Sequence, residues 1–105
     1  MIWFKMKLKK GRKIMELKEL RASIDVIDRQ IVELFEKRMD VSAGIALAKK
    51  EAGLPIYDPK REEEKLKSIE SLATKDEYKP FLRELYTNLF EYSKELQNKV
   101  EDNEK

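Results

Sequence analysis

Residues 17–53 read LKELRASIDVIDRQIVELFEKRMDVSAGIALAKKEAG. Apolar residues recur along this stretch at alternating steps of three and four, with one step missing after Leu34, at Leu17, Leu20, Ile24, Ile27, Ile31, Leu34, Val41, Ile45 and Ala48. This spacing predicts one long α-helix with a heptad-like apolar face. Gly53 and Pro55 supply a C-cap glycine and a helix breaker, so we expect the helix to end near Gly53. At about 1.5 Å per residue, roughly 36 residues make a rod of about 54 Å, longer than a compact monomer of this size needs.

Two shorter helices are predicted after the long one. Asp58 and Pro59 place an N-cap acceptor and then a proline in the first turn of the second helix, whose expected inward residues are Leu66, Ile69, Leu72 and Ala73. After a polar connection over residues 74–79, Pro80 begins a third helix with a stripe formed by Leu82, Leu85, Tyr86, Leu89, Ser93, Leu96 and Val100. Since no alternating strand pattern is present, the predicted fold is all-α, with three helices per protomer, one of them very long.

The composition narrows the chemistry that the chain can perform. Its 105 residues are enough for one domain. The absence of cysteine and histidine excludes thiolate nucleophiles, imidazole bases and the commonest transition-metal ligands, so we expect no metal and no cofactor. With 42% charged and 9% aromatic residues, a single copy would have a thin core. A partner subunit is therefore expected.

The two ends of the chain differ from its middle. Before Met15 there are six basic residues and no acidic one. We interpret residues 1–14 as a basic, disordered extension, residues 15–101 as the helical domain and residues 102–105 as a frayed tail. A basic arm can bind nucleic acid or an anionic membrane, but a solvated terminus is the preferred interpretation. No apolar run resembles a signal peptide or a membrane span, so a cytoplasmic protein is expected.

Arg38 is the main anomaly in the long helix. It stands four residues after Leu34, where the spacing of the apolar face calls for an apolar residue. Lys49 follows eleven residues later, which returns it to within about 20° of the same direction and about 17 Å along the axis. Both long cations can therefore lean toward one point beside Ser42. The alternative is structural: Arg38 pairs with a carboxylate of another helix, and Lys49 extends into water.

Arg21 lies seventeen residues before Arg38, about 26 Å along the axis and about 100° around it. One small ligand cannot touch both side chains from the same straight helix. If Arg21 is functional, it must come from an antiparallel second copy of the helix, and the site is then shared between subunits. The alternative is that Arg21 is an exposed helix residue that forms an ion pair with Asp25, four residues further along the chain.

Polar residues also stand out on the two shorter helices. In the first turn of the second helix, Asp58 suits a cap and Glu62 suits the positive helix end, but Arg61 there suggests an anionic partner. On the third helix, Ser93 and Gln97 are four residues apart on the face that also carries Tyr86 and Phe90. Two hydrogen-bonding groups inside an apolar stripe indicate a small polar cavity.

The order and spacing of these residues resemble the all-helical class of chorismate mutases. The resemblance rests on Leu-x-x-x-Arg21-x-x-Ile-Asp-x-Ile-Asp28, Arg38, Lys49, Asp58-Pro-x-Arg61-Glu62 and Ser93-x-x-x-Gln97, and it covers Glu16 to about Val100. It implies an intertwined antiparallel homodimer of three-helix protomers, with two active sites that each draw on both subunits.

The resemblance also implies a role for each residue. Arg21 of the partner and Arg38 would bind the two carboxylates of chorismate, with Arg61 close to the same polar network. Lys49 and Gln97 would contact the ether oxygen of the bond that breaks, and Glu62 would accept a hydrogen bond from the substrate hydroxyl. Asp58 and Ser93 would complete the binding shell.

The implied reaction is the rearrangement of chorismate to prephenate, an isomerase step in phenylalanine and tyrosine biosynthesis that needs no nucleophile, metal or proton transfer. Two alternatives remain open. The same fold can eliminate pyruvate from isochorismate, although the complete Asp58-Pro-x-Arg61-Glu62 motif favours the mutases. The second alternative is a non-catalytic helical dimer with a nucleic-acid-binding arm. Nucleic acid is less favoured as a partner than a small dicarboxylate.

Overall fold

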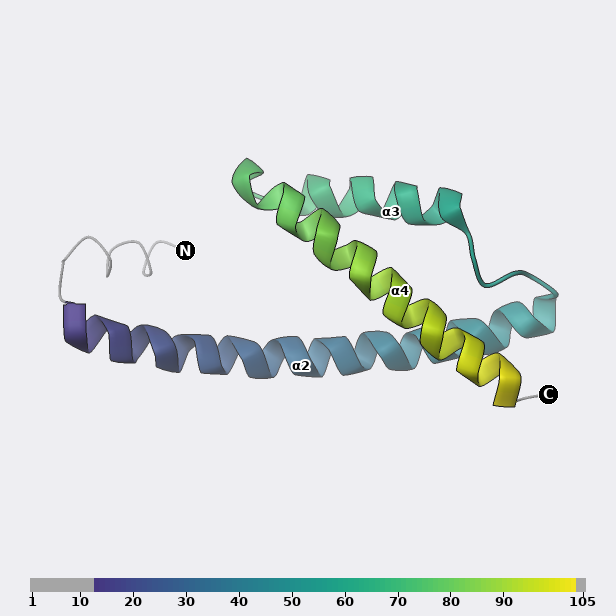
Figure 1. Ribbon diagram of the computed structural model, residues 1–105, viewed down its shortest axis with the longest axis horizontal. Helices are drawn as coiled ribbons and strands as arrows, with labels where there is room; N and C mark the ends of the chain where they lie inside the picture. Colours follow the sequence, from purple (N-terminus) through teal and green to yellow (C-terminus); the bar gives the residue numbers. More distant parts are fainter. Residues whose placement is uncertain (1–12, 104–105) are drawn as a thin grey trace. The chain divides into compact units, whose positions relative to one another are not determined.

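The computed structural model describes residues 13–103, which form three α-helices and one short 3-10 helix and contain no strand (Figure 1). The prediction of an all-α chain with one very long helix is confirmed. No helix among these described residues is long and apolar enough to cross a membrane. The predicted extension (residues 1–14) and tail (residues 102–105) stay predictions, because residues 1–12 and 104–105 lie outside the described residues; residues 13, 14, 102 and 103 are helical.

Helix α2 spans Lys13–Ala52 and begins four residues before the expected Leu17. It ends where the sequence predicts, because Gly53 adopts a left-handed φ of 70°. The amide of Gly53 donates to the carbonyl of Lys50 over 3.2 Å, and the amide of Leu54 donates to that of Lys49 over 2.8 Å. These two bonds form a Schellman cap, which satisfies carbonyls that the helix end would otherwise leave free.

The apolar face of α2 is largely uncovered in a single chain. Ile24, Ile31, Leu34 and Val41 are each more than half exposed, between 57% and 64%. Exposed apolar patches on soluble proteins are often sites of interaction with another protein or a membrane.

Helix α3 spans Pro59–Leu72, and α4 spans Lys79–Asn103, one residue earlier than the expected start. Between them lies the 3-10 helix η1, Asp76–Tyr78. Residues 38–105 form one compact unit, in which the buried apolar residues are Ala46, Leu66, Ile69 and Phe90. The prediction that Leu72 points inward is wrong, since it is 73% exposed. Leu72 is the last residue of α3, and Ala73, also expected inward, is only half-buried and forms the C-cap, where the chain turns away from the helix.

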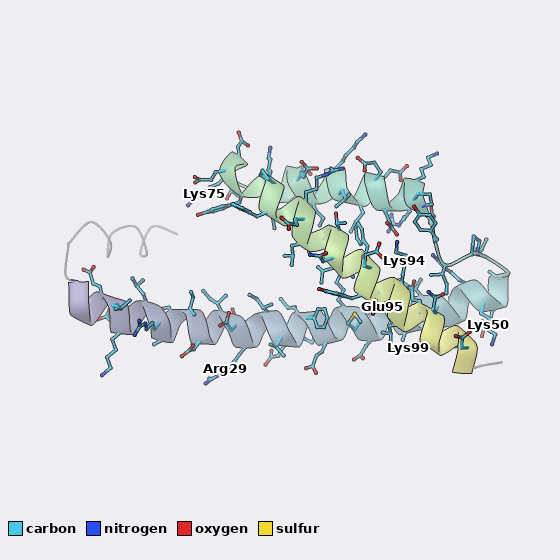
Figure 2. The ribbon with its side chains drawn as sticks, in the orientation of Figure 1. Arg29, Lys50, Lys75, Lys94, Glu95 and Lys99 are labelled. Carbon is cyan, nitrogen blue, oxygen red and sulfur yellow. The ribbon has the colours of Figure 1, made fainter. Side chains whose placement is uncertain are left out.

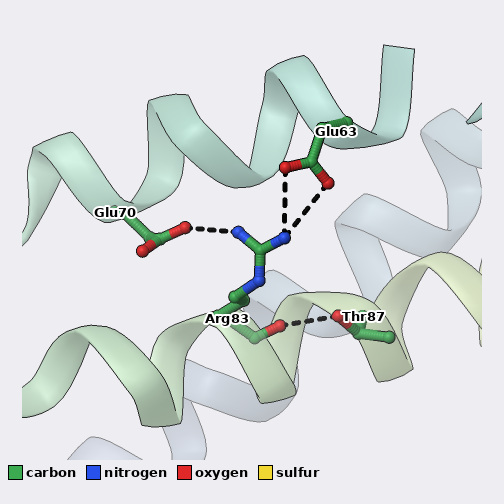
Figure 3. A network of polar contacts seen from close by, with 4 residues as sticks. All are labelled: Glu63, Glu70, Arg83 and Thr87. Carbon is green, nitrogen blue, oxygen red and sulfur yellow. Dashed lines mark hydrogen bonds and ion pairs between the residues drawn. The ribbon is translucent and has the colours of Figure 1, made fainter. Parts of the chain in front are cut away.

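An arginine clamp joins α3 to α4 (Figure 3). The Arg83 guanidinium donates to Glu70 over 2.6 Å and to both carboxylate oxygens of Glu63 over 3.1 Å. The two carboxylates stand seven residues apart on α3, so both face α4. The hydrogen bond to Glu70 is the main cause that raises the pKa of Arg83, followed by the bond to Glu63.

Candidate functional site

A cavity of about 260 Å³ lies within the compact unit of residues 38–105. One face of α2 contributes Arg38, Ser42, Ile45 and Lys49, which are spaced by four, three and four residues. The connection before α3, the first turns of α3 and the C-terminal half of α4 supply the other lining residues, which are Ile56, Asp58, Arg61, Glu62, Lys65, Phe90, Ser93, Lys94 and Gln97. The structure thus brings together seven of the eight predicted site residues, all except Arg21.

The Arg38 guanidinium is held from two directions. Its Nη1 donates to the hydroxyl of Ser93 over 2.9 Å, and the group lies 5.7 Å from the ring centroids of both Tyr86 and Phe90. Among the described residues, no carboxylate lies at ion-pair distance from Arg38. A guanidinium carries five N–H donors. The remaining donors can therefore serve an anionic ligand in the cavity.

A buried polar network joins α2 to α4 beside Arg38. The Ser42 hydroxyl donates to that of Ser93 over 3.0 Å, and the Gln97 side-chain amide donates to the Ser42 carbonyl over 3.0 Å. All three residues are at least 92% buried. Buried polar groups of this kind persist only when they have partners. Here the partners fix Ser93 and Gln97 at the cavity wall.

Lys49 is half-buried rather than extended into water. Its ammonium donates to the carbonyl of Ile56 over 2.8 Å, in the connection that follows the Gly53 turn. The Schellman cap at Gly53 brings this connection back toward α2. One of the three N–H donors of Lys49 is used in this way.

The first turn of α3 has the cap that the sequence predicts. The carboxylate of Asp58 accepts from the Arg61 amide over 3.1 Å, and the Asp58 carbonyl accepts from the Glu62 amide over 3.1 Å. Pro59 stands at the start of the helix, where no amide donor is needed. The side chain of Arg61 is exposed at the mouth of the cavity, and that of Glu62 is half-buried.

Lys65 and Lys94 line the cavity and were missed by the sequence reasoning. Lys94 extends from α4 toward the start of α3 (Figure 2), where its ammonium lies 3.3 Å from the Glu62 carboxylate. The bond to Glu91 over 2.9 Å is the main cause that raises the pKa of Lys94; burial opposes this, and Glu62 adds to it. Two features of the sequence could have identified these lysines as site residues. Lys65 follows Arg61 by one helical turn, and Lys94 is the immediate neighbour of Ser93.

The cavity is electropositive. Five basic side chains and two carboxylates line it, an excess of three positive charges. A concave site with one sign of charge concentrates ligands of the opposite sign. The arrangement therefore suits a small anion, to which it presents several hydrogen-bond donors.

Arg21 lies in the other unit of the chain, residues 1–37, and is exposed. It is not among the residues that line the cavity in the described part of the chain. Its predicted action from a second subunit stays a prediction.

Known proteins similar in sequence to this chain include a T-protein and a chorismate mutase. The chain is 36% identical to the T-protein of Haemophilus influenzae over 81 residues, which cover 69% of this chain and 22% of that protein. It is 41% identical to the chorismate mutase of Methanocaldococcus jannaschii over 49 residues, 47% of this chain and 50% of that protein. The chain thus spans about a fifth of the T-protein and matches half of the archaeal enzyme.

A solved structure is also similar. A conserved hypothetical protein from Pyrococcus furiosus superimposes with a TM-score of 0.63 at 42% sequence identity, over 77% of this chain and 93% of that one. The model of the family described as "Chorismate mutase type II" matches residues 20–98, which include every predicted site residue from Arg21 to Gln97. The chain therefore belongs to the chorismate mutase type II family.

Proposed function

We propose that the chain catalyses the rearrangement of chorismate to prephenate. The observation that carries the proposal is the convergence of Arg38 and Lys49 on one cavity. In that cavity each cation is already fixed by a neutral partner, so its charge is not cancelled. Chorismate is a small dianion, and its rearrangement is concerted. It therefore needs a site that binds and orients it, which this cavity supplies without a nucleophile or a general base.

The donors of the site can serve the substrate without breaking their present bonds. The Lys49 ammonium has two further N–H donors beside the one given to Ile56, and the Gln97 amide has one beside the one given to the Ser42 carbonyl. We assign these donors to the ether oxygen, where negative charge grows as the C–O bond breaks. Donors fixed in advance at such an atom stabilise the transition state more than the ground state.

The other groups bind the substrate in this proposal. Arg38 pairs with one carboxylate, with Ser93 and the two rings holding the guanidinium in place. Glu62 accepts a hydrogen bond from the substrate hydroxyl. Asp58 and Arg61 complete the shell at the first turn of α3. A cytoplasmic location is part of the same proposal.

We further propose that the enzyme is a homodimer and that Arg21 of the second copy binds the other carboxylate. The uncovered apolar face of α2 supports the dimer, since residues such as Ile31 and Leu34 are more than half exposed in one chain. A dianion held by Arg38 alone would have one carboxylate without a matching guanidinium. An antiparallel second α2 would bring its own Arg21 to that end of the site.

The activity is tested by incubating the purified chain with chorismate and identifying the product. Loss of chorismate with matching formation of prephenate supports the proposal. A parallel incubation with isochorismate covers the pyruvate-lyase reaction of the same fold. Release of pyruvate from isochorismate, without prephenate from chorismate, would assign the chain to that reaction instead.

The shared site is tested by mixing two inactive variants, Arg21→Ala and Arg38→Ala. In a mixed dimer one site keeps both arginines and the other loses both, so random exchange restores roughly a quarter of the wild-type activity. If both arginines act within one chain, mixing restores nothing. A monomeric mass in solution would also contradict the shared site.

A further inference from the structure

Lys94 lines the cavity but has no role in the mechanism above. Its side chain is only 20% exposed, although lysine side chains usually reach solvent. Three groups from separate segments surround its ammonium: Glu62 of α3 at 3.3 Å, Glu91 of α4 at 2.9 Å, and the ring of Tyr57 with its centroid at 4.5 Å. A lysine fixed in this way holds its partners as well as its own position.

Glu62 is the partner that matters for the site. The other carboxylate that lines the cavity, Asp58, is already engaged as the α3 cap. Within the described residues, Lys94 is the cation that pairs with the Glu62 side chain. Without it, an uncompensated carboxylate would face the anionic ligand, and repulsion between like charges would weaken binding.

We propose that Lys94 is a positioning residue that holds the Glu62 carboxylate at the cavity wall and cancels its charge, so that Glu62 can accept a hydrogen bond from the hydroxyl of an anionic substrate. The inference rests on the proposed function, in which Glu62 has that task. Lys94 does not itself touch the substrate. Glu91 and Tyr57 contribute by fixing the ammonium.

The test compares four variants of the full chain in the chorismate assay. Lys94→Met removes the ammonium and is expected to lower kcat/KM by about tenfold or more, mainly through KM, because the hydroxyl contact is made in both the ground state and the transition state. Lys94→Arg keeps a cation within reach of Glu62 and should recover most of this loss. Lys65→Met removes one charge from the same cavity without removing the Glu62 partner. Lys99→Met removes an exposed lysine of the same helix (Figure 2) and should leave activity unchanged.

Glu62→Gln separates positioning from a general effect of charge. In the Lys94→Met background, Glu62→Gln removes the uncompensated carboxylate, so this second substitution should raise kcat/KM. In the wild-type background, Glu62→Gln removes the carboxylate acceptor of the substrate hydroxyl, so kcat/KM should fall. If Lys94 acts only through net charge, Glu62→Gln raises kcat/KM in both backgrounds, and Lys65→Met costs as much as Lys94→Met. Either result would overturn the proposal.

Failure of this inference is distinguishable from failure of the proposed function. A wild-type chain that does not convert chorismate refutes the function, and with it the task assigned to Glu62. An active wild type together with an unchanged Lys94→Met variant refutes the positioning role alone. Melting temperatures of all variants, measured by circular dichroism, separate loss of activity from loss of fold. If Lys94→Met does not fold, Glu62→Gln in the wild-type background decides the matter, because positioning predicts a lower kcat/KM and a net-charge effect predicts a higher one.

Discussion

Replacing Lys49 with alanine should separate catalysis from stability. In the structure this ammonium makes one hydrogen bond of 2.8 Å to the Ile56 carbonyl. Its loss should lower the free energy of unfolding by about 1 kcal/mol, a typical value for one intramolecular hydrogen bond. In the proposed mechanism the same ammonium stabilises charge on the ether oxygen. Removing one donor of that kind costs about 3 to 4 kcal/mol of transition-state stabilisation, which lowers kcat about 100- to 1000-fold.

The control for this variant is Lys50→Ala, one residue further along α2. Lys50 is exposed (Figure 2) and does not line the cavity, yet its replacement removes the same charge from the same turn of helix. Chorismate consumption gives kcat and KM for both variants, and chemical denaturation gives their unfolding free energies. Near-normal turnover by a folded Lys49→Ala protein would remove Lys49 from the mechanism. An equal loss in Lys50→Ala would show that only net charge matters.

Three further predictions concern the helix end, the arginine clamp and the response to pH. Gly53→Ala should destabilise the fold by about 1 to 2 kcal/mol, because a side chain is disfavoured at a φ of 70°, and thermal unfolding measures this. Arg83→Met removes the partner of Glu63 and Glu70 but, since the side chain is 42% exposed and solvent screens its ion pairs, the loss of stability should be small and should shrink in high salt, as denaturation at two salt concentrations would reveal. Gln97 cannot titrate, so the rate should not rise toward low pH; a steep increase in kcat/KM on acidification would show that a carboxyl group has the role assigned to the amide.

The raised pKa of Lys94 also has a consequence for stability. A lysine with a higher pKa in the folded state contributes stability that is fully present below the ordinary value of 10.5 and is lost as pH rises through the folded value. We therefore expect an alkaline loss of stability that is smaller in Lys94→Met than in the wild type. Equal melting temperatures for the two proteins throughout the alkaline range would contradict this expectation.

The sequence alone was sufficient for the features that depend on local geometry. The period of the apolar residues predicted the long helix, Gly53 predicted its end, and Asp58 with Pro59 predicted the start of α3. The same helical period placed Arg38 and Lys49 on one face. Each of these follows from interactions within a few residues, which the order of residues specifies directly.

The contacts between helices were decided only by the tertiary structure. Ser93 and Gln97 meet α2 through hydrogen bonds that join residues 51 to 55 positions apart, and Lys94 reaches Glu62 from another helix. The exposure of Leu72 is a second case, because its periodicity suits an inward position but the chain turns away directly after it. Helical period gives the direction of each side chain around its own axis. It does not give the angle and register at which two helices cross, and these determine which side chains touch.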